Sequence, residues 1–156
     1  MNTITAAVLC AAMVSAQMPR AKFACKHTKQ IVKECKKKKL DPIVFVSLIH
    51  VESNWKPHVV SYANACGLTQ VLPRYSKYSC KQLKSPRTSI NEGTRILKYW
   101  VHKYAKGNYY TALCGYNAGF RCKGKNPIKH GKQYAKKVMK MATRIMYHAE
   151  EQSEKR

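Results

Sequence analysis

The sequence predicts a small, mainly helical, single domain. Its 156 residues suit one compact domain and leave little room for a second. Several segments carry apolar residues at helical spacing, and no repeat or long linker separates them. We expect this domain to span residues 20–150, after a distinct N-terminal segment.

Residues 1–16 are predicted to be a secretory signal peptide. The first 19 residues carry no charged side chain, and Ile4 to Met18 is mostly apolar and rich in Ala. Val14-Ser15-Ala16 places small residues where a signal peptidase would cut. Against this, no Lys or Arg precedes the apolar stretch, and basic residues follow it closely. The alternative is a membrane anchor that is retained or later released.

Seven cysteines favour export to an oxidising compartment, either the periplasm or the exterior. Removing the signal peptide takes Cys10 away and leaves six, an even number that suggests disulfides. The candidates are Cys25, Cys35, Cys66, Cys80, Cys114 and Cys122. We expect pairing between neighbours in the chain (25–35, 66–80 and 114–122), although the sequence does not fix the connectivity. No Cys-x-x-Cys pair or paired His spacing appears, so no metal site is predicted.

Two helices are expected in the first third of the domain. Ala21 to Lys39 predicts a basic helix with a thin apolar face, ending in a solvated run of four lysines that the helix dipole stabilises. Asp41-Pro42 then opens a second helix, with Asp as N-cap and Pro at the first helical position. The following residues, 43–51, are apolar on nearly all faces, so this helix should be buried.

The remainder predicts one irregular stretch and three more helices. Residues 54–72 contain Pro57, Asn64 and Gly67 as breakers. Residues 89–106 have amphipathic helical spacing, and Gly107-Asn108 ends that helix and caps the next, at about 109–116. A last helix is expected from Gln133 to about Glu150. The residues expected to face inward in the 89–106 helix and the last helix are Ile90, Leu97, Val101, Tyr104, Val138, Met141, Ala142 and Ile145.

The charge is strongly one-sided. Thirty Lys and Arg face seven Asp and Glu, which gives a formal net charge of +23. Such a surface attracts polyanions such as nucleic acid, an anionic membrane or an acidic wall polymer. It argues against a small neutral substrate as the main partner.

Because acidic residues are so few, each can be assigned. Asp41 is a cap, Glu34 lies in a Lys-dense helix, and Glu92 is expected to form an exposed surface pair with Arg95. The last three acids, at 150, 151 and 154, fall in a predicted solvated tail. Glu52 differs, because it ends the buried apolar helix, where burial and the helix dipole both raise the pKa of a carboxyl group. A carboxyl that keeps its proton near neutral pH suits a general acid, although a structural Glu bonded to hydroxyls is the alternative.

Four ordered blocks of sequence carry a family resemblance. The first reads Glu52-Ser53-Asn54-Trp55-Lys56-Pro57, then Ser61, Ala65-Cys66-Gly67-Leu68-Thr69-Gln70 and Pro73. The others are Pro86 with Asn91, Gly93 and Leu97, then Gly115-Tyr116-Asn117-Ala118-Gly119, then Tyr134 with Val138. Together they cover about residues 40–140 and resemble the catalytic domain of soluble lytic transglycosylases, the lysozyme-like family of cell-wall enzymes.

The resemblance implies a lysozyme-like fold, similar to goose-type lysozyme, and a role for each matching residue. Glu52 would be the catalytic acid and then the base, with Tyr134 bonded to its carboxyl group. Ser53 would support the site, and Tyr116 and Asn117 would contact the sugar. The cleft would be lined by Gly67, Leu68, Thr69 and Gln70. The family implies no cofactor and no metal.

Some positions depart from the family pattern. Thr69 replaces the usual Met, and Cys66 fills a variable position that allows a disulfide. Asn64 stands where Gly is preferred, but Asn tolerates a left-handed backbone. His130-Gly131 replaces a Glu-Thr before the last Tyr, which puts that end of the cleft in doubt.

A one-carboxylate mechanism fits this set of acids. Most glycosidases use two carboxylates, yet the only Asp lies about ten residues before Glu52, roughly 15 Å away along one helix. The resemblance implies that Glu52 protonates the oxygen between N-acetylmuramic acid and N-acetylglucosamine. The same residue then accepts the proton of the sugar's 6-hydroxyl, which closes a 1,6-anhydro ring.

Two other functions stay open: a hydrolytic muramidase on the same fold and a non-enzymatic basic binder. The expected partners are peptidoglycan glycan strands and the anionic envelope surface, with no nucleic acid, and the protein is expected to be a monomer. A phage endolysin, a secretion or conjugation enzyme and a wall-turnover enzyme all fit, and the small size and basic charge favour the first. If the N-terminal segment stays attached, Cys10 could pair with a domain cysteine and hold the enzyme inactive.

Overall fold

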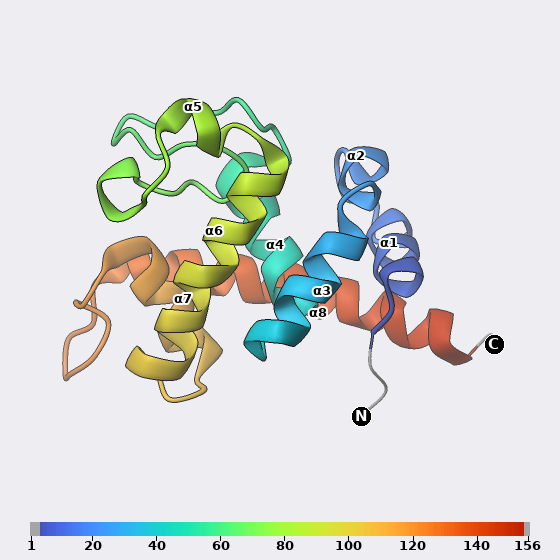
Figure 1. Ribbon diagram of the computed structural model, residues 1–156. Helices are drawn as coiled ribbons and strands as arrows, with labels where there is room; N and C mark the ends of the chain where they lie inside the picture. The colour runs from blue at the N-terminus through green and yellow to red at the C-terminus, as the bar shows by residue number, and fades with distance from the viewer. Residues whose placement is uncertain (1–3, 155–156) are drawn as a thin grey trace.

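The computed structural model describes residues 4–154 and consists of helices joined by turns and loops (Figure 1). The elements are α1 (Ala6–Ser15), α2 (Ala21–Cys25), α3 (Thr28–Lys38), α4 (Pro42–Ser53), η1 (Pro73–Tyr75), α5 (Cys80–Leu83), α6 (Pro86–Lys98), η2 (Tyr99–Tyr104), α7 (Tyr109–Ala118) and α8 (Lys129–Glu154).

The long helix α8 runs across the molecule behind α7, α4 and α3 in the view of Figure 1 and links its two sides. It packs against α7, α4 and α1, so that one helix contacts elements from both ends of the chain. On one side stand α6, η2 and α7, and on the other α1, α2 and α3. The segment between α4 and α6, which contains η1 and α5, lies above this framework.

Helix α4 forms the centre of the core, as its sequence predicts. The Asp41 carboxylate accepts hydrogen bonds from the backbone N–H groups of Ile43 and Val44, at 2.8 and 3.4 Å, and Pro42 occupies the first turn. Residues 44–49 are all buried. The helix ends where Asn54 adopts a left-handed backbone conformation, with φ of 49°, so Glu52 lies in the last turn.

The later helices follow the prediction with shifted ends. The helix expected at 89–106 begins at Pro86 and becomes a π-helical turn over η2, where the Ala105 N–H bonds the carbonyl of Trp100 at 2.9 Å. Asn108 caps α7 by accepting from the N–H of Thr111 at 2.9 Å. Helix α8 is longer at both ends than the predicted 133–150 segment, and of its four expected core residues only Met141 stays partly exposed.

The single basic helix expected at 21–39 is wrong, because the chain forms two helices there. The N–H groups of Lys26 and His27 bond the carbonyls three residues earlier, at 3.1 and 3.0 Å, and this tighter turn ends α2. Thr28 then starts α3, and its hydroxyl donates to the Cys25 carbonyl at 3.0 Å. Glu34, in this Lys-dense segment, forms an ion pair with Lys38.

Three disulfides occur among the described residues: Cys10–Cys25, Cys66–Cys80 and Cys114–Cys122. The expected Cys25–Cys35 pair is wrong. Helix α1 packs on α2 and brings Cys10 within 4.9 Å of Cys25, measured between Cα atoms, while Cys35 points into the core from α3. Burial raises the pKa of the free Cys35 thiol to about 12, so it stays protonated and unreactive at neutral pH.

The N-terminal segment is part of the packed core in this structure. Leu9, Ala12 and Met13 of α1 are fully buried, and the helix contacts α2, α3 and α8. Residues 1–3 of the predicted signal peptide lie outside the described residues, and the signal peptide stays a prediction. Across residues 4–154, no helix is both long and apolar enough to span a bilayer.

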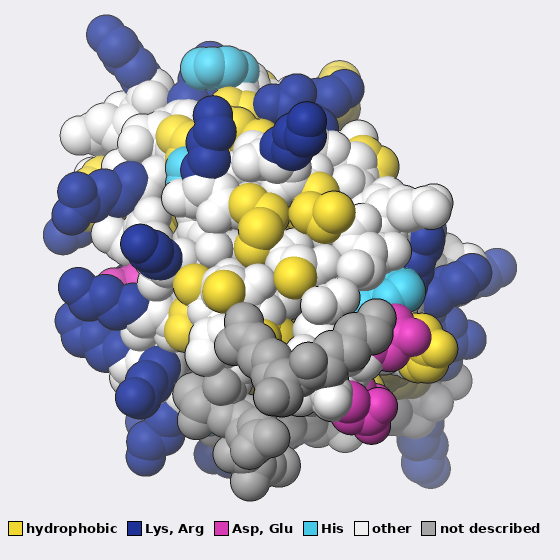
Figure 2. Space-filling view, turned by 90° about the vertical axis from the view of Figure 1, so that its right-hand side faces the viewer, with side chains coloured by type: hydrophobic (Ala, Val, Ile, Leu, Met, Phe, Trp, Pro, Cys, Tyr) yellow, Lys and Arg dark blue, Asp and Glu magenta, His cyan; other side chains and the backbone are white. Residues whose placement is uncertain are grey.

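On the face drawn in Figure 2, the basic side chains do not gather into one patch. Figure 2 shows Lys and Arg side chains around the edge of this face, with hydrophobic side chains near its centre and few Asp or Glu. A surface of this kind attracts anionic polymers through its summed charge rather than through one site.

Candidate active site

Glu52 projects from the last turn of α4 toward α7 and α8. The residue is half-buried, and burial raises the pKa of its carboxyl group to about 7. The hydroxyl of Tyr134 on α8 donates a hydrogen bond to Glu52 Oε1 at 2.6 Å, which lowers this pKa by a smaller amount. Near neutral pH, Glu52 is therefore able to give or take a proton.

Two tyrosines accompany Glu52: Tyr134, which is buried, and Tyr116, which is half-buried. The hydroxyl of Tyr116 on α7 donates to the Thr69 carbonyl at 2.7 Å. Burial and then the charge of Glu52 raise the phenol pKa values of Tyr116 and Tyr134 well above the usual value. Both phenols are therefore neutral hydrogen-bond donors, and three helices meet at this point.

The loop after α4 is fixed by side chains that the sequence analysis assigned to the site. The Ser53 hydroxyl donates to the Leu68 carbonyl at 2.8 Å, and the Gln70 amide donates to the Gly67 carbonyl at 2.9 Å. Gly67 has φ of +81°, and a Cβ there would lie 2.0 Å from the Leu83 carbonyl oxygen, so only glycine fits. Asn64, at φ of 64°, holds the left-handed turn expected of it.

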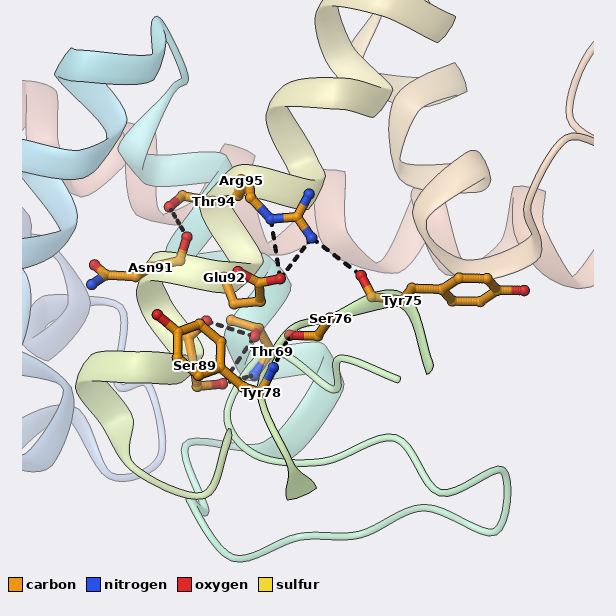
Figure 3. A network of polar contacts seen from close by, with 9 residues as sticks. All are labelled: Thr69, Tyr75, Ser76, Tyr78, Ser89, Asn91, Glu92, Thr94 and Arg95. Carbon is orange, nitrogen blue, oxygen red and sulfur yellow. Dashed lines mark hydrogen bonds and ion pairs between the residues drawn. The ribbon is translucent and has the colours of Figure 1, made fainter. Parts of the chain in front are cut away.

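Thr69 connects the loop of the site to α6. Its side chain is fully buried, and its hydroxyl donates to the Ser89 carbonyl of α6 at 2.9 Å (Figure 3). A Cβ on Gly93 would lie 2.5 Å from Thr69 Cγ2, so α6 and this loop are in close contact. Thr69, which stands where the resemblance expects Met, therefore contacts α6 directly.

The expectation that Glu92 is exposed is wrong. Arg95 is its partner as predicted, donating through Nε at 3.0 Å and Nη2 at 2.6 Å, but Glu92 is only 4% exposed. The end of η1 lies beside this pair, since Arg95 Nη2 also bonds the Tyr75 carbonyl at 3.2 Å and Ser76 hydrogen-bonds Glu92 (Figure 3). Burial by itself raises the pKa of Glu92, but hydrogen bonds from Arg95 and Ser76 and the charge of Arg95 bring it below the ordinary value.

A cleft of about 560 Å³ lies next to this group of residues, because Gln70 and Tyr116 line it and the Tyr116 phenol is close enough to Glu52 for the Glu52 charge to raise its pKa. Asn117 also lines it. The sequence motifs did not indicate most of the other residues that line the cleft, namely Arg74, Tyr75, Arg95, Tyr99, Trp100, Phe120 and Arg121. Several of these residues directly follow motif residues in the chain, as Phe120 follows Gly119. Their position next to a motif could have indicated that they line the cleft.

Within residues 4–154, no group of three or more His, Cys, Asp or Glu side chains is placed to hold a metal ion. Asp41 caps the opposite end of α4 from Glu52. Glu52 is therefore the acidic group that this cleft offers for proton transfer.

Comparison with known proteins points to one family. The family described as "Transglycosylase SLT domain" matches residues 29–149. The membrane-bound lytic murein transglycosylase C of Actinobacillus pleuropneumoniae is 30% identical over 105 residues, covering 56% of this chain and 29% of that protein. The soluble lytic murein transglycosylase of Salmonella typhimurium is 34% identical over 85 residues, covering 47% of this chain and 13% of that protein.

Solved structures show the same fold. The 70 kDa soluble lytic transglycosylase of Escherichia coli matches 90% of this chain, with a TM-score of 0.67 and 20% identity, and the chain covers 29% of it. The lytic transglycosylase Slt of Pseudomonas aeruginosa matches 86%, with a TM-score of 0.65 and 19% identity, again over 29% of that protein. The prediction of a mainly helical, lysozyme-like fold is confirmed. The chain spans less than a third of the length of these relatives.

Proposed function

Because the chain belongs to the transglycosylase SLT domain family, we propose that it is a peptidoglycan lytic transglycosylase. It cleaves the β-1,4 bond between N-acetylmuramic acid and N-acetylglucosamine and leaves a 1,6-anhydro sugar. The observation that carries this proposal is Glu52, a half-buried carboxyl with a pKa of about 7 beside the cleft, held by Tyr134.

The proposed reaction uses Glu52 twice. The protonated carboxyl first gives its proton to the glycosidic oxygen, and the bond from that oxygen to the muramic acid C1 breaks. The carboxylate then takes the proton of the sugar's 6-hydroxyl, whose oxygen bonds C1 and closes the ring. Glu52 ends protonated as it began, and no water is consumed. Tyr134 donates to the carboxylate form between the two steps and holds its orientation.

The surroundings of the other acids support a single-carboxylate route. A two-carboxylate glycosidase needs a second free carboxylate across the scissile bond. Glu92 is committed to Arg95, and Asp41 is committed to the first turn of α4. Neither is free to act as a nucleophile or to activate water.

The test is mass spectrometry of fragments released from purified peptidoglycan by the wild type and by Glu52→Gln. Anhydro-muropeptides, lighter by one water than hydrolysis products and absent with the variant, are expected. Glu34→Gln is a matched control, because it removes a carboxylate that is paired on α3, outside the cleft. Reducing-end products would make the protein a muramidase, and no release by the folded wild type would leave only the basic binder.

Export and attraction to the anionic cell envelope are part of the proposal. Three disulfides support an oxidising compartment, and the net charge of +23 supports binding to an anionic envelope. Cleavage after Ala16 would remove Cys10 and leave Cys25 unpaired, whereas a retained segment keeps their bond. The intact mass of the exported protein separates a chain beginning near Gln17 from one that retains α1.

A further inference from the structure

A second hollow, of about 540 Å³, lies between the end of α4, at His50, Val51 and Asn54, and residues 137–144 of α8. Among the described residues, this α4–α8 hollow shares no lining residue with the cleft, and Glu52 does not line it. Successive residues of an α-helix are about 100° apart, so Glu52 leaves α4 on nearly the opposite side from His50. The α4–α8 hollow is therefore separate from the proposed catalytic cleft.

Three cations of α8 line this hollow, and no Asp or Glu among the described residues does. Lys137, Lys140 and Arg144 are spaced at i, i+3 and i+7, so they share one face of the helix within about 10 Å of helical rise. All three side chains are exposed, and none belongs to an ion pair formed within residues 4–154. Like charges at this spacing destabilise a helix, which indicates a role other than holding α8 together.

The α4 wall of the hollow carries uncharged polar groups. Burial and then the charge of Arg144 lower the pKa of His50, while the neighbouring Asn54 amide opposes this shift by a smaller amount. The effect of Arg144 places its guanidinium group near the imidazole, which is neutral at pH 7. Within residues 4–154, neither His50 Nδ1 nor Asn54 Oδ1 has a hydrogen-bond partner of ordinary geometry, although the two side chains are neighbours. This wall therefore leaves the cations of α8 unneutralised and keeps polar atoms uncommitted.

Three cations in one hollow favour a ligand with more charge than a carboxylate. A carboxylate has one negative charge and two oxygens, whereas a phosphomonoester has about two negative charges near pH 7 and three terminal oxygens. Lysine binds such oxygens as a point charge, and arginine binds them through its planar fork. Pro19, Val51 and Met141 also line the hollow, so an aliphatic group that carries the phosphate can pack there.

We propose that the α4–α8 hollow binds a phosphomonoester on a small aliphatic group, such as a terminal glycerol phosphate, through Lys137, Lys140 and Arg144. This site goes beyond the cleavage proposed above, because a ligand there leaves Glu52 and the cleft free. The phosphate comes either from a free ester or from a lipid headgroup that ends in phosphate. In the second case, the hollow holds the protein on a phosphate-bearing surface while the cleft stays open to glycan.

The first measurement is calorimetric binding of glycerol 3-phosphate to the whole protein, with succinate for comparison. Both ligands carry about two negative charges above pH 7, so a difference in affinity reports the phosphate group and not the charge. We expect glycerol 3-phosphate to bind about tenfold more tightly, and Lys140→Gln and Arg144→Gln each to weaken its binding about fivefold. Lys136→Gln is the matched control, because Lys136 is exposed on α8 outside the hollow and its loss changes the net charge equally.

The His50 imidazole reports whether the ligand enters the hollow. An anion beside Arg144 offsets the charge that lowers the His50 pKa, so saturating glycerol 3-phosphate should raise this pKa by about half a pH unit or more in an NMR titration. The double variant Lys137→Gln/Lys140→Gln keeps Arg144 in place and should reduce the rise at the same ligand concentration.

Co-sedimentation with vesicles separates the two sources of phosphate. Phosphatidylcholine vesicles that contain phosphatidic acid present a phosphomonoester, and vesicles with phosphatidylglycerol at equal surface charge present a phosphodiester. A preference for phosphatidic acid that Lys137→Gln/Lys140→Gln abolishes assigns a lipid headgroup to the hollow. Equal binding to both vesicles, with the preference for glycerol 3-phosphate over succinate retained, assigns a free ester.

Three results overturn the inference: equal affinity for glycerol 3-phosphate and succinate, an equal loss with Lys136→Gln and Lys140→Gln, or binding that leaves the His50 titration unchanged. The last two would mean that the basic surface as a whole holds the ligand. None of these measurements involves turnover. The inference therefore stands or falls separately from the lytic activity, which the fragments released by the wild type and by Glu52→Gln test.

Discussion

Glu52 and Glu92 are two carboxyl groups beside one cleft, shifted in opposite directions. Burial raises the pKa of Glu52 to about 7, while Arg95 and Ser76 bring that of Glu92 below its ordinary value. Both act on the same phenol, since the charges of Glu52 and Glu92 each raise the pKa of Tyr116. Burial is common to the two, so the difference comes from the partner each one has.

The different hydrogen-bond partners of Glu52 and Glu92 give the two acids different roles. Glu52 receives a neutral hydroxyl from Tyr134, which stabilises its charge only weakly and leaves the proton transferable. Glu92 receives a cation, which fixes its charge and in return fixes the position of Arg95 on the cleft wall. Environments that separate the pKa values of two neighbouring acids are typical of active sites.

The largest expected effect is on catalysis. Glu52→Gln removes the transferable proton and should lower kcat/KM on peptidoglycan by about a thousandfold or more. Glu92→Gln removes a carboxylate that transfers no proton, and should cost less than about tenfold. The turnover assay is run with circular dichroism on both variants. Equal losses in two folded proteins would contradict the separation of roles.

The second effect is on stability. Arg95→Met leaves Glu92 buried without a cation and should lower the free energy of unfolding by about 3 kcal/mol at pH 7. Because the wild-type pKa of Glu92 is lowered, its contribution is present above the unfolded value of 4.5 and is lost as the pH falls below it. The difference between wild type and variant should therefore shrink toward pH 3 in urea titrations.

Lys38→Met is the control for that measurement, because Lys38 is the cation of an ordinary i, i+4 pair with Glu34. Its loss should cost less than about 1 kcal/mol. If Arg95→Met and Lys38→Met lower the free energy of unfolding equally, the burial of Glu92 does not make its pair with Arg95 more important for stability than the pair of Glu34.

A third effect is on the pH dependence of stability, where Glu52 acts in the opposite direction to Glu92. The folded pKa of Glu52 is raised, so its carboxyl group stabilises the fold fully below pH 4.5, and this contribution is lost as the pH rises through about 7. Glu52→Gln carries no such dependence and should be more stable than wild type by about 2 kcal/mol at pH 8, with little difference at pH 4. Thermal melts at both pH values test this, and a gain that does not change with pH would count against the raised pKa.

The smallest effect concerns the hydroxyl on Glu52. The Tyr134 hydrogen bond lowers the Glu52 pKa, so Tyr134→Phe should move the alkaline decline of kcat/KM upward by up to about one pH unit. The rate at pH 7 should fall about fivefold, as expected for a lost neutral hydrogen bond. Tyr110→Phe is the control, since Tyr110 also bonds α8, at the Lys132 carbonyl, outside the site. A decline shifted downward would reverse the proposed role of Tyr134.

Local chemistry made α4 and its end predictable. The cap by Asp41, the proline after it and the unbroken apolar run all act within one helix, and the structure reproduces each. The loop glycine at position 67 and the tolerant Asn64 are likewise set by their own backbone conformations. The sequence also singled out Glu52, because it alone among seven acids lies at the end of a buried helix.

Contacts between segments far apart in the chain account for the features that the sequence did not predict. The sequence shows Glu92 and Arg95 three residues apart, but not that Tyr75 and Ser76 at the end of η1 bond to this pair or that Glu92 is buried. Likewise, Cys25 pairs with Cys10 of α1 and not with Cys35 of α3, because α1 packs against α2 and brings these two sulfur atoms within bonding distance. The arginines of the cleft lie on η1, on α6 and in the loop after α7, and no local pattern connects them.

The sequence by itself therefore determined α4, α6, α7 and α8 as helices, the caps at Asp41 and Asn108, the family blocks and the identity of the acid at the end of α4. These depend on periodicity and on neighbours within a few residues, which the chain order contains. Only the tertiary structure decided the pKa of Glu92, the disulfide of Cys10 and the arginine lining of the cleft. Electrostatic and covalent partners act through space, and a pKa responds to whichever charge the fold brings close.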